Sequence, residues 1–90
     1  MAIASVWRQL NRYHMASLQD RHPVVASKHN AYAVALVDAL NELATPEEIH
    51  AVTGGDIKKV RAEILATQDK IEAMAFELAK KLEAQGIKFE

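Results

Sequence analysis

The sequence predicts an all-α fold of four helices, an orthogonal or bundle-like domain whose long C-terminal helix (about 56–85) serves oligomerisation. Apolar residues recur at helical spacing through most of the chain, and prolines and glycines fall between these periodic stretches. Strand-like alternation is absent before residue 87. Because ninety residues support one hydrophobic core, we expect a single domain over residues 1–90.

The first helix is predicted over residues 2–18. Apolar side chains fall on one of its faces and polar side chains on the other, as in an amphipathic helix. Pro23 disfavours the α conformation at His22, so the chain breaks there, and Pro23 then suits the first turn of a new helix. The apolar face comprises Ile3, Val6, Trp7, Leu10, Tyr13 and Leu18.

The second helix is expected to begin between Pro23 and Asn30 and to end near Leu43. Its residues 31–40 are apolar almost all round, which is typical of a helix buried at the centre of a fold. Asp38 is the one charged residue in this stretch. We expect it to pair with Arg8 or Arg12 of the first helix, the alternative being exposure to solvent.

A capping box marks the start of a short third helix, about residues 46–52. Thr45 can cap its N-terminus, Pro46 fits the first helical position, and Glu48 closes the box. Gly54 or Gly55 is expected to end the helix in the left-handed conformation.

The fourth helix is predicted to run from a cap at Asp56 to Gln85, with Gly86 ending it. It would be roughly 45 Å long at 1.5 Å per residue. A compact chain of this length has a radius of gyration of only about 12 Å. The helix should therefore extend beyond its own globule and need a partner. Beyond it, Ile87 and Phe89 alternate as in a lone extended segment.

An apolar seam with heptad spacing follows this helix and predicts association with a second copy, giving a homo-oligomer and most simply a dimer. Thr67 and Lys81 interrupt it. A second apolar strip lies round the other side, at Ala62, Leu65, Ala66, Ala73, Phe76 and Ala79. One strip would then pack on the protomer's own helices and the other on a partner, unless one chain covers both. The predicted interface residues are Ile57, Val60, Ile64, Ile71, Met74 and Leu78.

The first helix also carries a candidate site for another protein. Trp7 and Tyr13 lie on its apolar face, and Arg8 and Arg12 are one turn apart. Tryptophan, tyrosine and arginine are the residue types enriched at interface hot spots. Packing of Trp7 in the core is the alternative interpretation.

Residues 45–64 have the spacing of a helix-turn-helix and resemble the DNA-binding motif of bacterial regulators. In that motif the start of the second helix enters the major groove. Here this start carries Lys58, Lys59 and Arg61 as candidate DNA-binding residues. The alternative is a capped corner that only turns the chain into the long helix. His50 and Gly55 depart from the pattern, because a small residue and an apolar one are expected at these positions.

Composition narrows the function classes. The chain has no cysteine and a pI of 6.4, well below that of a dedicated nucleic-acid binder. The net charge of −1 combines a basic half, residues 1–35, with an acidic half, residues 36–90. We expect the two halves to attract each other within or between chains, the alternative being a basic N-terminal face that binds an acidic partner such as nucleic acid. No apolar run reaches the roughly 20 residues of a membrane span, and no signal-peptide pattern opens the chain. We expect a soluble, cytoplasmic protein with no membrane partner.

No catalytic, cofactor or metal site is predicted. Gly54-Gly55 is an isolated pair rather than a phosphate loop, and the serines lack a nucleophile motif. The four histidines, His14, His22, His29 and His50, lack the spacing of zinc ligands. The predicted function is therefore non-catalytic binding of another protein by an adaptor, inhibitor, regulator or small assembly subunit. The alternative is a DNA-binding regulator, with nucleic acid as its partner.

Overall fold

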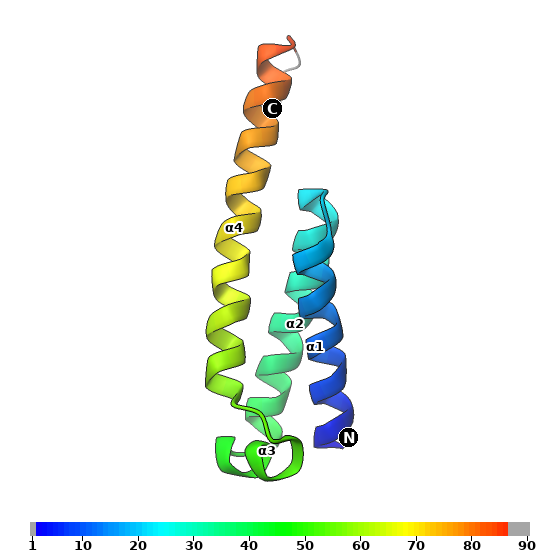
Figure 1. Cartoon of the computed structure of the whole chain (residues 1–90), viewed down its shortest axis with the longest axis vertical. Helices are drawn as coiled ribbons and strands as arrows, with labels where there is room; N and C mark the ends of the chain where they lie inside the picture. The colour runs from blue at the N-terminus through cyan, green and yellow to red at the C-terminus, as the bar shows by residue number, and fades with distance from the viewer. Residues whose placement is uncertain (1, 87–90) are drawn as a thin grey trace.

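The computed structural model describes residues 2–86. This part of the chain is 87% helical, contains no strand, and comprises α1 (Ile3–Gln19), α2 (Pro23–Leu43), α3 (Pro46–Thr53) and α4 (Ile57–Ala84). The predicted all-α class is confirmed. In Figure 1, α1 and α4 run in one direction, α2 runs in the other, and the short α3 crosses one end. The extended segment expected at residues 87–89 lies outside the described residues.

Local capping places the helix ends where the sequence predicts them. Thr45 Oγ1 accepts from the Glu48 backbone N–H at 3.2 Å, and Glu48 Oε1 accepts from the Thr45 N–H at 3.1 Å, which completes the capping box. Gly54 ends α3 with φ of 74°, in the left-handed region. Asp56 Oδ1 accepts from the N–H groups of Lys58 and Lys59 and so caps α4. These bonds satisfy donors that a helix leaves unpaired.

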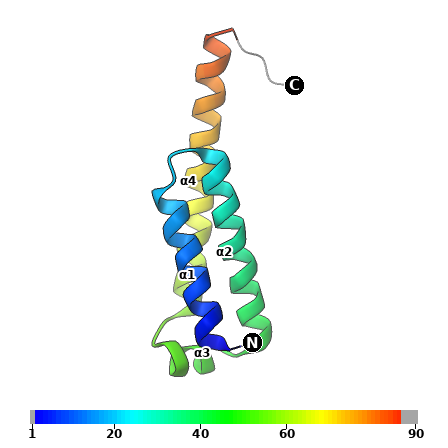
Figure 2. The ribbon, with the colours of Figure 1, turned by 90° about the vertical axis from the view of Figure 1, so that its right-hand side faces the viewer.

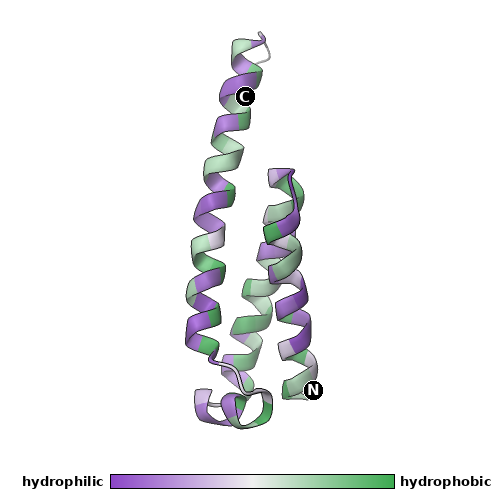
Figure 3. Cartoon of the chain, viewed as in Figure 1, coloured by the Kyte–Doolittle hydropathy of each residue, from purple (hydrophilic) through white to green (hydrophobic). Residues whose placement is uncertain are grey.

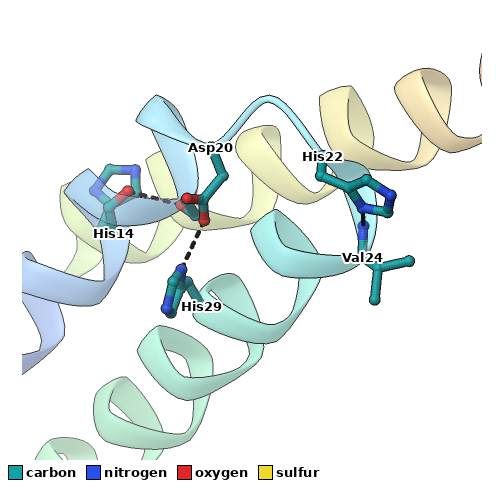
Figure 4. Close-up of polar contacts among 6 residues, drawn as sticks. His14, Asp20, His22, Val24 and His29 are labelled. Atoms are coloured by element: carbon teal, nitrogen blue, oxygen red, sulfur yellow. Dashed lines mark hydrogen bonds and ion pairs between the residues drawn. The ribbon is translucent and has the colours of Figure 1, made fainter.

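A third N-terminal cap, at the start of α2, was not predicted. His22 Nδ1 accepts from the Val24 backbone N–H at 3.2 Å, at the start of α2 (Figure 4). Pro23 occupies the first helical position and is buried. The α1–α2 corner is thus held by a histidine rather than by one of the usual capping residues.

The prediction that the second helix is buried at the centre of the fold holds for only one side of α2. One face is buried, at Ala26, Ala33, Val37 and Leu40, whereas Tyr32 and Asp38 are exposed. The expected pair between Asp38 and an arginine of α1 is also wrong, since within residues 2–86 neither ion pair involves Asp38. The physical reason is that α2 has only α1 and α4 beside it, so its remaining side faces water despite its alanines.

The core lies at the end of the molecule that α3 closes. Val6 and Leu10 of α1 meet Val37 and Leu40 of α2, and Ile49 of α3 is fully buried with them. Ile57 and Ile64 of α4 complete this cluster. Each such side chain contributes on the order of 1.5–3 kcal/mol by leaving water.

Towards the opposite end, several polar side chains are buried between the helices alongside apolar ones such as Ala26 and Ile71. His14 of α1 lies 3.4 Å from Thr67 of α4, Nε2 to Oγ1, and both are buried. Ser17 donates to the His14 carbonyl oxygen at 2.7 Å. Asn30 of α2 is also buried, and its Oδ1 has no hydrogen-bond partner among the described residues. A polar interior of this kind holds helices together less strongly than an apolar one.

The molecule is elongated because α4 continues past the other helices. Its radius of gyration is 15.9 Å and its extents are 54 × 21 × 19 Å. Ile71 is the last buried residue of α4. Residues 72–84, which we call the overhang, add roughly 20 Å of helix beyond it, above the α1–α2 connection in Figure 2. Figure 3 shows that hydrophobic residues continue along this part of the helix.

Candidate interaction surfaces

The first half of the predicted seam packs inside the chain. Ile64 and Ile71 are 1% and 6% exposed, and Ile57 is equally buried. Val60 is half-buried against the same core. Ile57, Ile64 and Ile71 face the protomer's own helices and have no surface left for a partner. The assignment of these three residues to an interface between chains is therefore corrected, because they pack within the chain instead; Val60 keeps part of its surface exposed.

The second half of the seam lies on the overhang. Met74 is 37% exposed and Leu78 is half-buried. These two residues are the part of the predicted interface that lies beyond the last buried residue of α4. Leu82, which was not predicted, is also half-buried and follows Leu78 by about one helical turn.

A groove lies where the overhang passes the α1–α2 corner. We call it the shoulder groove. One side of it is the corner itself, Arg21, His22 and Pro23. The other side is α4, from Lys70 to Lys81, with Met74 and Leu78 as its large apolar side chains. The remaining lining residues are Ala73 and Glu77.

The second apolar strip of α4 faces solvent. Leu65 and Phe76 are both exposed, Phe76 by 62%, and the alanines at 62, 66 and 73 are exposed with them. Lys80 Nζ lies 4.7 Å from the centre of the Phe76 ring, a cation–π contact that partly shields the ring. Leu65 and Phe76 are eleven residues apart, and the other residues of this strip are alanines. The strip therefore offers large apolar side chains at only two positions.

The predicted protein-binding residues of α1 line a second open groove. Trp7 and Tyr13 are half-buried and pack against the core. Arg8 and Arg12 are exposed, and the Arg8 guanidinium reaches only Ser5, at 3.3 Å. The structure therefore brings all four residues to one surface and leaves the arginines accessible.

Asp20 and His29 form an ion pair beside this groove that sequence reasoning did not identify. Asp20 Oδ2 and His29 Nδ1 are 2.6 Å apart and clamp α1 to α2 (Figure 4). The His29 ring also stacks on Tyr13, with centroids 6.0 Å apart, and Tyr13 meets Tyr32 edge-on at 5.1 Å. No local pattern signals this pair, because the corner at Pro23 brings the two residues together.

The α3–α4 corner presents its basic residues to solvent. Lys58, Lys59 and Arg61 are exposed on the first turns of α4. Gly55 precedes them, and the Trp7 ring occupies the space beside it where a side chain would otherwise lie. The departure at Gly55 from the helix-turn-helix pattern thus has a structural cause.

The described residues hold no metal-binding constellation: among residues 2–86, no three His, Asp or Glu side chains gather closely enough to hold an ion. The two ion pairs of this region, Asp20 with His29 and Glu77 with Lys80, each lie within one half of the chain, so neither joins the basic half to the acidic half. No helix in residues 2–86 is long and apolar enough to cross a membrane.

Comparison with known proteins gives no guide to function, since no family model, curated protein or solved structure matches this chain.

Proposed function

We propose that this chain is a non-catalytic, self-associating protein that acts by binding another protein, as an adaptor, inhibitor, regulator or small assembly subunit. The overhang of α4 carries the proposal. Most of the stability of a helix in a protein comes from tertiary packing of its apolar face, so a helical segment with nothing packed on it lacks that contribution. Residues 72–84 have no neighbouring helix beyond the shoulder and still present Met74, Phe76 and Leu78. A partner that covers them stabilises the helix and removes apolar surface from water.

Two separate surfaces support two kinds of partner. The overhang serves self-association. The groove on α1 serves a different protein, through the exposed guanidinium groups of Arg8 and Arg12 beside the aromatic edges of Trp7 and Tyr13. The surfaces lie on different helices, so both can be occupied in one assembly.

Self-association is tested by light scattering at micromolar concentration. Wild type should give at least twice 10.0 kDa. Met74→Asp with Leu78→Asp should give a folded monomer, because the overhang is not part of the core. Leu65→Asp with Val52→Asp, two exposed apolar positions away from the overhang, is the matched control and should stay oligomeric. A wild-type monomer that melts cooperatively would overturn the proposal of self-association.

Partner binding is tested by affinity capture from the native host after nuclease treatment, with mass spectrometry as the readout. Arg8→Glu with Arg12→Glu should lose a protein that wild type retains. Lys28→Glu with Lys58→Glu makes the same charge change at exposed positions outside both the α1 groove and the shoulder groove and should retain it. If both variants capture the host protein equally well, the α1 groove is not the surface that binds it.

DNA recognition is the second candidate, and the α3–α4 corner favours it. A capped helix, a left-handed Gly54 and exposed Lys58, Lys59 and Arg61 are the parts that a helix-turn-helix needs. We rank DNA recognition below protein binding for two reasons. The helix α4 is much longer than a recognition helix, and residues 36–90 carry a net negative charge that phosphates would repel.

Retention on mixed duplex DNA at about 50 mM salt separates the two candidates, because non-specific phosphate binding is strong there. We expect no retention. Tight, salt-sensitive binding that disappears when Lys58, Lys59 and Arg61 become Glu would reverse the ranking. Replacing Arg8, Arg12 and Lys28 by Glu gives the same change of charge away from both the corner and the overhang and serves as the control.

A further inference from the structure

We infer that the α1 groove, which Trp7, Arg8, Arg12 and Tyr13 line, binds an acidic amphipathic helix of another protein. Two carboxylates of this helix, one turn apart, meet Arg8 and Arg12, and its apolar side chains meet the aromatic rings. The inference rests on the proposed binding function of α1 and names the chemistry of the partner.

The groove is basic and has no acidic counterpart of its own. Arg8 and Arg12 are exposed, and no carboxylate is among the residues that line the groove. Neither ion pair within residues 2–86 involves an arginine. Asp20 is the one acidic residue in positions 1–35, and its carboxylate lies against His29 rather than against either arginine. The two guanidinium charges are therefore available to carboxylates of a partner.

The apolar side chains of the groove are held in place before a partner arrives. Trp7 packs against the core and against the backbone of Gly55. Tyr13 packs against the core and stacks on His29. Met15 adds an apolar side chain that is 54% exposed. Rings that are already fixed lose little conformational freedom on binding, so they suit the role of anchors for the apolar stripe of a partner.

The dimensions of the groove match a helix of about three turns. Its lining on α1 extends over residues 7–19, which is roughly 18 Å at 1.5 Å per residue. Arg8 and Arg12 are one turn apart, about 6 Å along the axis, and residues four apart on a partner helix have the same spacing. An extended segment could not pair its backbone N–H and C=O groups with this surface, because both lining elements, α1 and α2, are helices.

A protein fits this surface better than a nucleic acid does. Base stacking needs accessible ring faces, whereas Trp7 and Tyr13 are half-buried and the Tyr13 ring is stacked on His29. Two arginines and no lysine line the groove, and affinity for phosphates rises with the number of cations that contact them. The pI of 6.4 also disfavours a nucleic acid.

Selection from a displayed library of helical peptides with randomised surface positions, carried out on the full chain, tests the inference. Peptides enriched on wild type should carry two carboxylates three or four residues apart beside an apolar stripe. Their binding should shift or quench the fluorescence of Trp7, which is the single tryptophan of the chain. Arg8→Glu with Arg12→Glu should instead enrich peptides with lysine or arginine at those positions. Absence of any enriched peptide, or enrichment of peptides without the carboxylate pair, would overturn the inference.

Titration of one enriched peptide, followed by Trp7 fluorescence, measures the contribution of the arginines. Arg8→Glu with Arg12→Glu should weaken binding about 10- to 100-fold, since two attractions become repulsions. Arg8→Gln with Arg12→Gln removes the charges without reversing them and should weaken binding less. Lys28→Glu with Lys58→Glu changes exposed positions outside the groove and should bind like wild type. Equal affinity of all four proteins would reject the role assigned to the arginines.

Two further results separate the acidic helix from other partners. Tighter binding of a single-stranded DNA or RNA oligonucleotide, lost in Arg8→Glu with Arg12→Glu, would assign the groove to nucleic acid and reject the inference. Host capture that depends on the two arginines, together with selected peptides that lack carboxylates, would retain the proposed function and reject an acidic helix as the partner.

Discussion

The Trp7 indole ring lies on the backbone of Gly55. A methyl group added at Gly55 would be 2.5 Å from Cη2 of Trp7 and closer still to Cζ2. Gly55 does not have a positive φ, so the close approach of the ring, rather than the backbone conformation, requires glycine there. Through this contact α1 holds the corner from which α4 begins.

Gly55→Ala should destabilise the protein by about 1–3 kcal/mol, because the ring must move within a packed site. Urea unfolding measures the change. Trp7→Leu removes the obstacle, so adding Gly55→Ala to that variant should change stability much less than in wild type. Additive effects of the two substitutions would show that the ring and the glycine do not interact.

At the neighbouring Gly54, glycine is required by the backbone conformation and not by a close contact. A side chain there would have nothing within 4 Å, but its φ of 74° strains other residues. Gly54→Ala should cost about 1 kcal/mol, and this loss should be the same with Trp7 or Leu at position 7. A rescue of Gly54→Ala by Trp7→Leu would contradict the separate causes assigned to the two glycines.

Thr45→Ala should lower the free energy of unfolding by about 1 kcal/mol, since it removes the acceptor for the Glu48 N–H. Thr45→Ser retains the hydroxyl and should be close to wild type. Chemical denaturation monitored by circular dichroism distinguishes them. A loss below about 0.3 kcal/mol for the alanine variant would mean that the cap does not hold α3.

Asn30→Leu should raise the stability of the fold. The buried Oδ1 of Asn30 has no partner among the described residues, and an unpaired buried polar group costs about 1–3 kcal/mol. The midpoint of thermal unfolding should increase, whereas Ala31→Leu, an exposed change one position away, should leave it nearly constant. A fall after Asn30→Leu would show that the amide has a compensating interaction.

The contact between Asp20 and His29 should make a small contribution to the free energy of unfolding. Both side chains are about three-quarters buried, and the 2.6 Å contact joins α1 to α2. A double-mutant cycle with Asp20→Ala and His29→Ala should give a coupling of roughly 0.5–1 kcal/mol in urea unfolding. A coupling near zero would leave the stacking of His29 on Tyr13 as the contact that matters at this corner.

The Ile64→Asp, Ile71→Asp double substitution illustrates how the structure changes an interpretation. The seam alone suggests that it would separate two copies. Because both side chains are buried within one chain, it would instead disrupt the packing of α4 on its own helices. Met74 and Leu78 are the positions at which self-association can be tested without that loss.

The sequence by itself determined the four helices and the boundaries of α3 and the start of α4, whereas it left the start of α2 open between Pro23 and Asn30. The residues that set these ends act on backbone groups only a few positions away, so a short stretch of sequence is enough to predict their effect. They are Thr45, Glu48, Gly54 and Asp56. Only the tertiary structure decided which apolar strip of α4 packs on α2, that Asp38 faces water, and that Trp7 meets Gly55. Periodicity fits either strip, and the Trp7 contact joins residues far apart in the chain. Such contacts follow from how whole helices pack, which no local pattern of residues specifies.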